Sequence, residues 1–244
     1  FIAKKPKVII IGAGFAGLAA AKYLHKKGID FVILEARNRI SGRVFSHTID
    51  EKENLIIELG AEWVGNSHER IQNLCNEFGL ELQNNQFDTH LIYKGNYYKK
   101  NEWDYSEDWN KKFKAIIDHY PKLTQAEKLK IDKMDWWRFL VNNGCEGRDL
   151  DIRELLDSTD FGETIRSVSA FAALAEYAES SEKNEMDLKI KGGNSMLAKK
   201  IADKIGNDKI KLQHAVSRVV QNSKGGVTVY CNNGQKFTAD KILC

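Results

Sequence analysis

The hydrophobic positions at the start of the chain predict a buried strand, a sharp turn and a helix. Val8–Ile11 is a continuous apolar run, as in strands that are buried on both faces of a parallel sheet. A glycine-rich segment, residues 12–17, follows it, and apolar residues then recur at helical spacing until Gly28 ends the helix. A second apolar strand, Phe31–Leu34, leads to the acidic residue Glu35. The pattern is therefore that of a strand–helix–strand unit.

Helical periodicity dominates the middle of the chain, from residue 105 to about residue 180. The helices expected there cover residues 109–120, a helix opened by a capping box at Thr124, and residues 135–141, 152–156 and 163–178. The elements expected outside this block are a strand at 56–59, a helix at Glu69–Phe78, a hairpin turning at Gly95-Asn96, a helix carrying Leu197, Ile201 and Ile205, and strands at 210–212, 216–220, 227–231 and 236–243. The adjacent tryptophans Trp136 and Trp137 are interpreted as core or inter-helix packing rather than as a substrate cage.

This alternation predicts an α/β fold in three segments. Residues 1–85 and 186–244 form a Rossmann-like nucleotide-binding domain, and residues 86–185 contribute a hairpin and an inserted, mainly helical block. The chain is expected to stop in the middle of a strand, so that one sheet edge stays unpaired.

The glycine spacing carries a specific chemistry. Gly12 permits the tight turn, Gly14 lets the backbone approach a pyrophosphate, and Gly17 lets the helix pack close to the strand. The backbone N–H groups at the helix start, including those of Phe15 and Ala16, face the phosphates. Glu35 lies 18 residues after Gly17, where a carboxylate accepts a hydrogen bond from a ribose 2′-OH and repels a 2′-phosphate. The segment therefore predicts a dinucleotide site that disfavours NADP.

Composition narrows the remaining choices. The formal net charge is +3, and the charges of both signs are interspersed, which gives no support for nucleic-acid binding. No apolar run reaches membrane-spanning length. Cys75, Cys145, Cys231 and Cys244 have no metal-ligand spacing, so we expect buried or incidental thiols and no metal. The scattered thiols permit a reducing compartment without requiring one, and the location expected is cytoplasmic.

Four segments together resemble the flavin-dependent amine oxidase family, which includes monoamine and polyamine oxidases. They are the glycine-rich turn, the run from Leu34 to Arg43, the run from Glu58 to Gly65, and the run from Lys191 to Met196. They occur in the family's order over the whole chain. One departure is Ser41, which replaces the first glycine of a Gly-Gly-Arg sequence.

The resemblance implies FAD as cofactor and extends the candidate site. Ala36 and Arg37 adjoin Glu35, and Gly42 brings the Arg43 guanidinium, a bidentate partner for phosphate, to the pyrophosphate. For Arg37 above all, a surface ion pair is the alternative. Gly60 and Ala61 match the place where the family's backbone passes the flavin ring, which requires small residues. Val216 matches a valine whose main chain meets the adenine, although by sequence alone it is a core strand residue.

Glu62 and Trp63 bear on the substrate. In the family's amino-acid oxidases the position of Trp63 is commonly an arginine that pairs with a carboxylate, whereas an indole offers apolar or cation–π contact. Glu62 attracts a substrate ammonium or accepts a hydrogen bond on the cofactor side. These residues favour amines over α-amino acids.

The resemblance implies oxidation of a C–N bond, with O2 as acceptor and imine, then aldehyde, ammonia and H2O2 as products. Family members are much longer, so we expect an N-terminal part that holds FAD weakly and is inactive alone, its catalytic residues unassigned, with the missing C-terminal half as partner. Three alternatives remain: an L-amino-acid oxidase, a desaturase or porphyrinogen-type flavoenzyme, and a non-catalytic FAD-binding fragment. A plain NAD dehydrogenase is the weakest reading, because it gives residues 37–43 no role.

Overall fold

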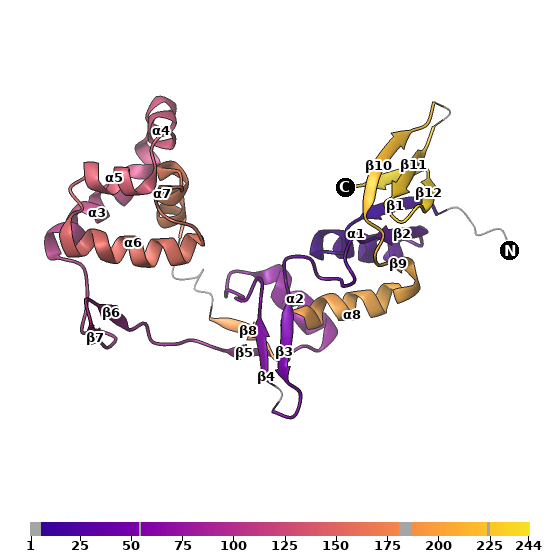
Figure 1. Cartoon of the computed structure of the whole chain (residues 1–244), viewed down its shortest axis with the longest axis horizontal. Helices are drawn as coiled ribbons and strands as arrows, with labels where there is room; N and C mark the ends of the chain where they lie inside the picture. Colours follow the sequence, from indigo (N-terminus) through magenta and orange to yellow (C-terminus); the bar gives the residue numbers. More distant parts are fainter. Residues whose placement is uncertain (1–5, 54, 181–186, 224) are drawn as a thin grey trace. The chain divides into compact units, whose positions relative to one another are not determined.

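The chain forms two compact units, each with its own hydrophobic core (Figure 1). The computed structural model describes residues 6–53, 55–180, 187–223 and 225–244. One unit is built from Phe1–Gln86 and Glu185–Cys244, and the other from Phe87–Asn184. The second unit, which is mainly helical, is thus a continuous segment between two parts of an α/β unit.

A four-stranded parallel sheet forms the centre of the α/β unit. Its strand order is β13-β1-β2-β9, with β1 at Val8–Ile11, β2 at Phe31–Leu34, β9 at Ile210–Lys211 and β13 at Lys241–Leu243. In the register, Val8 faces Phe31 on one side and Lys241 on the other. All four residues of β2 are buried, as a central strand of a parallel sheet requires.

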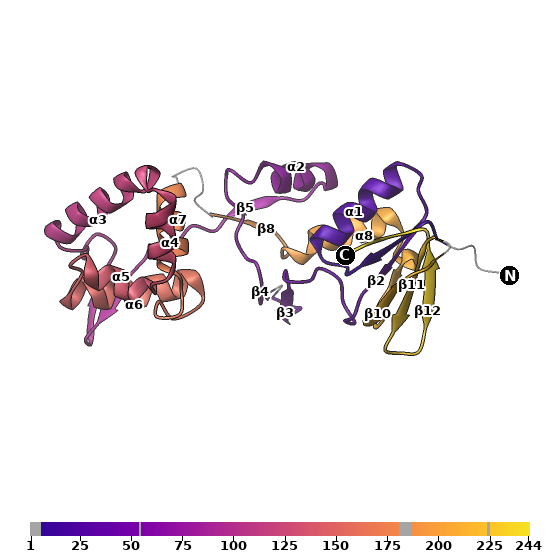
Figure 2. The same cartoon turned by 90° about the horizontal axis from the view of Figure 1, so that it is seen from above.

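Helices cover one face of this sheet, and a second, antiparallel sheet covers the other (Figure 2). The helices are α1 at Phe15–Lys26 and α8 at Ser195–Ile205, and α2, at Glu69–Phe78, packs against α8; the second sheet is β10 at Val216–Gln221, β11 at Val227–Cys231 and β12 at Lys236–Ala239. Val8 and Ile10 of β1 pack with the helices, whereas Ile9 packs with Val229 of β11. The alternation of side chains along one strand therefore supplies two core layers.

Two strands of this unit were absent from the sequence prediction. β3, at Ser46–Asp50, pairs with β4, at Leu55–Glu58, and β5, at Leu82–Asn84, pairs with β8, at Leu188–Ile190. β3 and β5 are mostly exposed and polar, so neither shows the alternation that marks a half-buried strand. Their partners, rather than their own sequences, determine that they are extended.

The single strand predicted at residues 236–243 is wrong. The structure breaks it at Asp240, so that β12 pairs antiparallel with β11 while β13 pairs parallel with β1. The backbone N–H groups of Asp240 and Lys241 both donate to the carbonyl of Lys7 at 3.1 Å. The hydrophobic pattern of residues 236–243 is the same whether they form one strand or pass from one sheet to the other. The sequence therefore did not reveal the break at Asp240.

The helical unit has one aromatic core. Its elements are β6 at Leu91–Tyr93, β7 at Asn96–Tyr98, α3 at Glu107–His119, α4 at Gln125–Asp132, α5 at Trp136–Asn142, α6 at Gly147–Phe161 and α7 at Ala170–Glu179. The capping box at Thr124 is present, and Trp136 is fully buried in the core, as predicted. The β6–β7 turn consists of Lys94 and Gly95, both at positive φ, and not of Gly95-Asn96.

Two helix boundaries in this unit differ from the prediction. α7 begins at Ala170, not at residue 163, because the carbonyls of Ile165 and Val168 accept hydrogen bonds from the start of α5. The Ser169 hydroxyl then caps the new N-terminus. α6 covers Gly147–Phe161, far beyond the predicted residues 152–156, since its polar positions hide much of its helical period.

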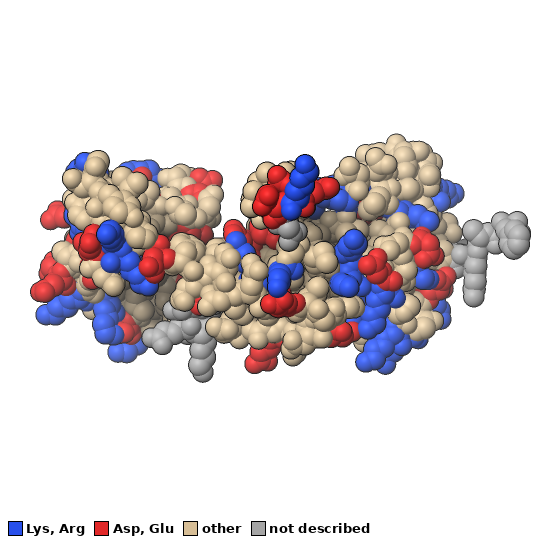
Figure 3. All heavy atoms as spheres, turned by 90° about the horizontal axis from the view of Figure 1, so that it is seen from below, with Lys and Arg blue, Asp and Glu red and all other residues tan. Residues whose placement is uncertain are grey.

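The cysteines are free thiols, and the charged side chains are distributed over the surface (Figure 3). Cys75, Cys145 and Cys231 are buried free thiols, and burial raises the pKa of each, to about 12 for Cys145. Positive and negative side chains are interspersed on the face in Figure 3. Within the described part of the chain, no helix is long and apolar enough to cross a lipid bilayer.

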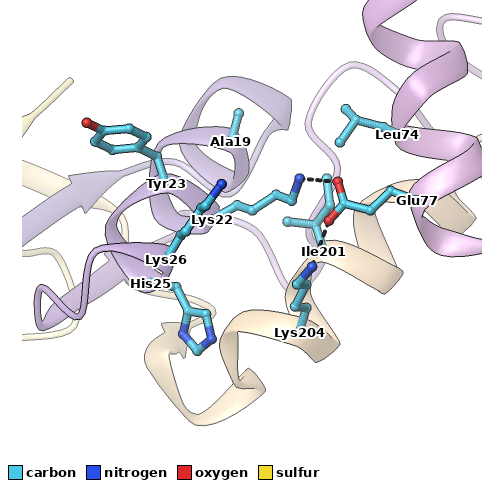
Figure 4. A pocket seen from close by; sticks show the side chains of 9 residues that line it. All are labelled: Ala19, Lys22, Tyr23, His25, Lys26, Leu74, Glu77, Ile201 and Lys204. Carbon is cyan, nitrogen blue, oxygen red and sulfur yellow. Dashed lines mark hydrogen bonds and ion pairs between the residues drawn. The ribbon is translucent and has the colours of Figure 1, made fainter.

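A surface hollow of about 610 Å³ between α1, α2 and α8 gives a prediction on acid stability (Figure 4). Glu77 of α2 bridges Lys204 of α8 and Lys22 of α1. Hydrogen bonds from Lys204, and then from Lys22, lower the pKa of Glu77 from 4.5 to about 2. A lowered folded-state pKa stabilises the fold above the unfolded-state value, so this contribution should disappear as the pH falls from about 4.5 towards 2. Glu77→Gln should flatten that part of the stability–pH curve.

The matched control is Glu69→Gln, at the exposed N-terminal end of the same helix. Urea unfolding at pH 7 and in steps below pH 4.5 measures the difference. An acid limb of equal size in Glu77→Gln and in the unaltered chain would contradict the prediction.

Candidate functional site

The glycine-rich turn between β1 and α1 has the geometry of a ligand cradle. Gly12 has φ +93°, and a Cβ atom placed there would meet nothing within 4 Å, so open space lies beside the turn. A Cβ atom at Gly17 would lie 2.0 Å from the carbonyl oxygen of Gly12. Gly17 thus permits the close contact of helix and strand for which the sequence predicted it.

No side chain in the described part of the structure caps the N-terminus of α1. Its N-cap residue is Gly14, no side chain caps the first turn, and that turn carries no acidic residue. The free N–H groups and the positive end of the helix dipole are therefore left for an external anion. Phe15 and Ala16 occupy the first turn, and Ala16 is exposed.

Glu35, at the end of β2, closes the turn from the other side. Its side chain is buried, and its two carboxylate oxygens accept the N–H groups of Ala13 at 2.7 Å and Arg37 at 2.8 Å. A carboxylate has about four acceptor sites, so these two bonds leave capacity for a hydroxyl of a ligand. The hydrogen bond from Ala13 thus fixes the Glu35 carboxylate beside the glycine-rich turn.

The loop from Ala36 to Arg43 runs against the turn. Ser41 donates its N–H to the carbonyl of Ala13 at 2.9 Å, and a Cβ atom at Gly42 would lie 3.1 Å from Cα of Gly14. Among the described residues, neither Arg37 nor Arg43 forms an ion pair, and both are exposed. Both guanidinium groups therefore remain available to an anion, and their contact with a pyrophosphate stays a prediction.

Ser41, which stands where the family has glycine, carries two features that destabilise the fold. It is 3% exposed, its φ is +83°, and its hydroxyl oxygen has no hydrogen-bond partner among the described residues. Left-handed backbone at a non-glycine residue and an unsatisfied buried hydroxyl each destabilise a fold by about 1–3 kcal/mol. We expect Ser41→Gly to stabilise the α/β unit by about 1–2 kcal/mol, after the entropy that glycine loses on folding.

Urea unfolding would test this. Ser41→Ala removes the hydroxyl and keeps the strained φ, so it should give only part of the gain. A lower unfolding midpoint for Ser41→Gly than for the unaltered chain would contradict the interpretation.

Gly60 and Ala61 join this loop through the backbone. Ala61 donates its N–H to the carbonyl of Arg43 at 3.0 Å, and a Cβ atom at Gly60 would lie 2.2 Å from that same oxygen. The sequence predicted a small residue at Gly60 because of a flavin ring. The structure shows a reason within the protein: the Arg43 carbonyl leaves no room for a side chain.

Glu62 and Trp63 both contact the side chain of Lys189. Lys189 of β8 forms an ion pair with Glu62, and its ammonium lies 4.5 Å from the centre of the Trp63 ring. The Lys189 side chain is 19% exposed. The ammonium that this pair binds in the structure is therefore that of Lys189, which the sequence analysis did not single out.

Val216 lies at the start of β10, next to a segment tied to Glu35. His214 donates its N–H to the Glu35 carbonyl at 2.8 Å, and Gln213 donates to the Arg37 carbonyl at 2.9 Å. Val216 itself is half-buried and faces Cys231 of β11. The fold thus brings the strand that carries Val216 to the acid, although they are far apart in sequence.

Sequence reasoning missed the polar residues that link these segments. Asn194, Glu58, Ser46 and Ser195 form a hydrogen-bonded cluster between β3, β4 and the start of α8. The available signal was Gly193-Asn194 just before a helical pattern, which indicates a cap. In the structure the Asn194 side chain makes no cap bond and turns to other partners.

Comparison with known proteins now decides the family. The family model for flavin containing amine oxidoreductases matches residues 15–244. The chain belongs to this family. The predictions of a flavin-containing amine oxidase family and of FAD as its cofactor are thereby confirmed.

Curated relatives agree over nearly the whole chain. Amine oxidase (flavin-containing) B of Homo sapiens is 25% identical over 268 residues, a match that covers 99% of this chain and 50% of that protein. The L-amino-acid oxidase of Mus musculus is 49% identical, but over only 86 residues, or 35% of this chain. The chain spans about half the length of the amine oxidase B sequences that it matches.

Solved structures share the mixed α/β fold. Putrescine oxidase bound to putrescine has a TM-score of 0.79 at 23% identity, and cyclohexylamine oxidase from Brevibacterium oxydans has the same values. The putrescine oxidase match covers 98% of this chain and 57% of the solved chain.

Proposed function

We propose that this chain is the cofactor-binding part of an FAD-dependent enzyme that oxidises the C–N bond of an amine with O2, giving an imine, then aldehyde and ammonia, and H2O2. One observation carries the proposal. Ala13 of the glycine-rich turn donates its N–H to the Glu35 carboxylate and accepts the N–H of Ser41 at its carbonyl. Two residues further along the same loop, the Arg43 carbonyl accepts the N–H of Ala61. A continuous surface of this kind suits an extended dinucleotide.

The residues fit the cofactor. The open space at Gly12, the uncapped α1 N-terminus and the two free guanidinium groups would hold the pyrophosphate. Glu35 would bind the ribose, Val216 would meet the adenine, and the backbone from Gly60 to Trp63 would face the flavin. When bound, FAD supplies the acceptor for the hydride of the carbon next to nitrogen.

The chain's own contribution to the reaction is binding and orientation. The α/β unit is the proposed FAD-binding domain, and the helical unit is the proposed part of a substrate domain. Because the relatives are about twice as long, we propose that turnover requires residues matching the rest of their length. The site must also favour the neutral amine, which desolvation does by lowering the substrate's pKa.

Equilibrium dialysis of the purified chain against FAD, ADP and NADP tests the cofactor assignment. We expect FAD and ADP to bind and NADP to bind far more weakly, because Glu35 repels the 2′-phosphate. A chain that takes up NADP as well as FAD, or that stays colourless in ample FAD, would contradict the assignment. A peroxide assay with primary amines and polyamines, on the chain extended by the matching C-terminal half, tests the reaction.

A second substrate class is favoured by one observation, the 49% identity to mouse L-amino-acid oxidase over 86 residues. An α-amino acid needs a cation for its carboxylate, and Trp63 cannot supply one. Lys189 beside it is already paired with Glu62. Peroxide from α-amino acids but not from amines that lack a carboxylate would establish the second class instead.

A further inference from the structure

The Asn194 side chain is placed where it fixes the backbone that follows Gly60. The residue is 7% exposed. Its amide nitrogen donates to two successive carbonyls, of Ala61 at 3.1 Å and of Glu62 at 2.6 Å. Its amide oxygen accepts the N–H of Ile190 at 3.0 Å. Both donor hydrogens and the acceptor of one buried amide are therefore used on main-chain groups.

The same stretch of backbone also contacts the loop that carries Arg43. Ala61 donates its N–H to the carbonyl of Arg43, and that carbonyl leaves no room for a side chain at Gly60. Residues 60–62 are therefore hydrogen-bonded both to the Arg43 loop and to Asn194. A movement of the Arg43 loop or of Asn194 would move these peptide groups.

Asn194 is itself positioned by a partly buried cluster of polar residues. The Glu58 carboxylate accepts the Asn194 N–H at 2.8 Å and the Ser46 hydroxyl at 2.9 Å. Ser46 and Ser195 exchange N–H to hydroxyl hydrogen bonds, both at 2.9 Å. A Cβ atom at Gly193 would lie 2.7 Å from the Ser46 side chain, so the two segments are in direct contact.

We propose that Asn194 is a positioning residue that gives the backbone of residues 60–62 the shape required by the flavin ring. This inference rests on the proposed function, because it assumes that FAD binds along this surface. The adenosine end of the site does not depend on the amide donors, since Glu35 and the β1–α1 turn have contacts of their own. Asn194 therefore contributes to binding of the flavin half alone.

The test titrates FAD and ADP separately into the unaltered full chain and into the Asn194→Asp variant, and it compares the affinities. The variant keeps the size and the acceptor for Ile190 but loses both donors to the carbonyls. We expect FAD affinity to fall about tenfold or more, and ADP affinity to stay within about twofold. Asn222→Asp in the same unit is the matched control and should change neither, because the Asn222 side chain bonds only Thr228 among the described residues, as an acceptor.

Asn194→Ser provides a second variant, which replaces the two amide donors by a single hydroxyl on a shorter side chain without adding a charge. The same selective loss of FAD binding in both variants supports the proposal. Equal losses of FAD and ADP in both variants would assign Asn194 a purely structural role and overturn it, as would unchanged FAD affinity. If the unaltered chain binds ADP but gains no affinity from the flavin half, the proposed function fails together with this inference.

Discussion

Replacing Gly17 by alanine should abolish FAD and ADP binding and destabilise the α/β unit. The added Cβ atom would lie 2.0 Å from the carbonyl oxygen of Gly12 and 3.3 Å from the Ile10 side chain. The first of these atoms is backbone in the turn itself, so relief requires α1 to move away from β1. Overpacking of a well-ordered core costs about 1–3 kcal/mol, and a backbone obstacle lies at or above the upper end of this range. Urea unfolding and ADP titration measure the two effects.

Gly14→Ala is the informative counterpart. A Cβ atom at Gly14 would meet only Cα of Gly42, at 3.8 Å, and the φ of Gly14 is −73°, which alanine adopts freely. This variant should fold normally and lose nucleotide binding if a pyrophosphate passes that position. Normal ADP affinity in Gly14→Ala would contradict the proposed path of the ligand, whereas normal stability in Gly17→Ala would contradict the steric argument.

Replacing Asp157 by alanine should cause the largest loss of stability in the helical unit. Asp157 is fully buried, and it accepts hydrogen bonds from Trp136 Nε1 at 2.6 Å and from the Tyr177 hydroxyl at 2.7 Å. Burial raises the pKa of Tyr177, so its hydroxyl remains a donor. Arg153 is 5% exposed, and its Nη1 lies 3.6 Å from Oδ1 of Asp157. Its guanidinium carbon lies 3.8 Å from the centre of the Phe113 ring. The carboxylate is thus the one buried anion facing that cation within the described core.

Removal of that carboxylate leaves the Arg153 charge and two donors uncompensated. Loss of one partner of a buried pair typically costs about 3–5 kcal/mol, and we expect a value in this range. Thermal unfolding followed by tryptophan fluorescence measures it, because Trp109 and Trp136 lie in this core.

Asp151→Ala is the control on the same helix. Asp151 is exposed and bonds the Tyr93 hydroxyl at 2.7 Å, so its removal should cost at most about 1 kcal/mol. Equal losses in Asp157→Ala and Asp151→Ala would contradict the role given to the buried pair.

The sequence by itself determined the features that depend on local chemistry. The strand–turn–helix at Val8 to Lys26, the left-handed glycine at Gly12 and the capping box at Thr124 each follow from residues within a few positions of one another. The family, too, was legible from four short segments. These features need no distant partner, so the one-dimensional pattern was sufficient.

Only the tertiary structure decided how the segments meet. It transferred the chain between sheets at Asp240, paired β3 with β4, and placed Lys189 on Glu62 and Trp63. It also brought Asn194 to the carbonyls of Ala61 and Glu62, more than 130 residues earlier in the chain. Contacts over such separations arise from packing between elements, and the hydrophobic pattern of each element is the same whichever partner it finds.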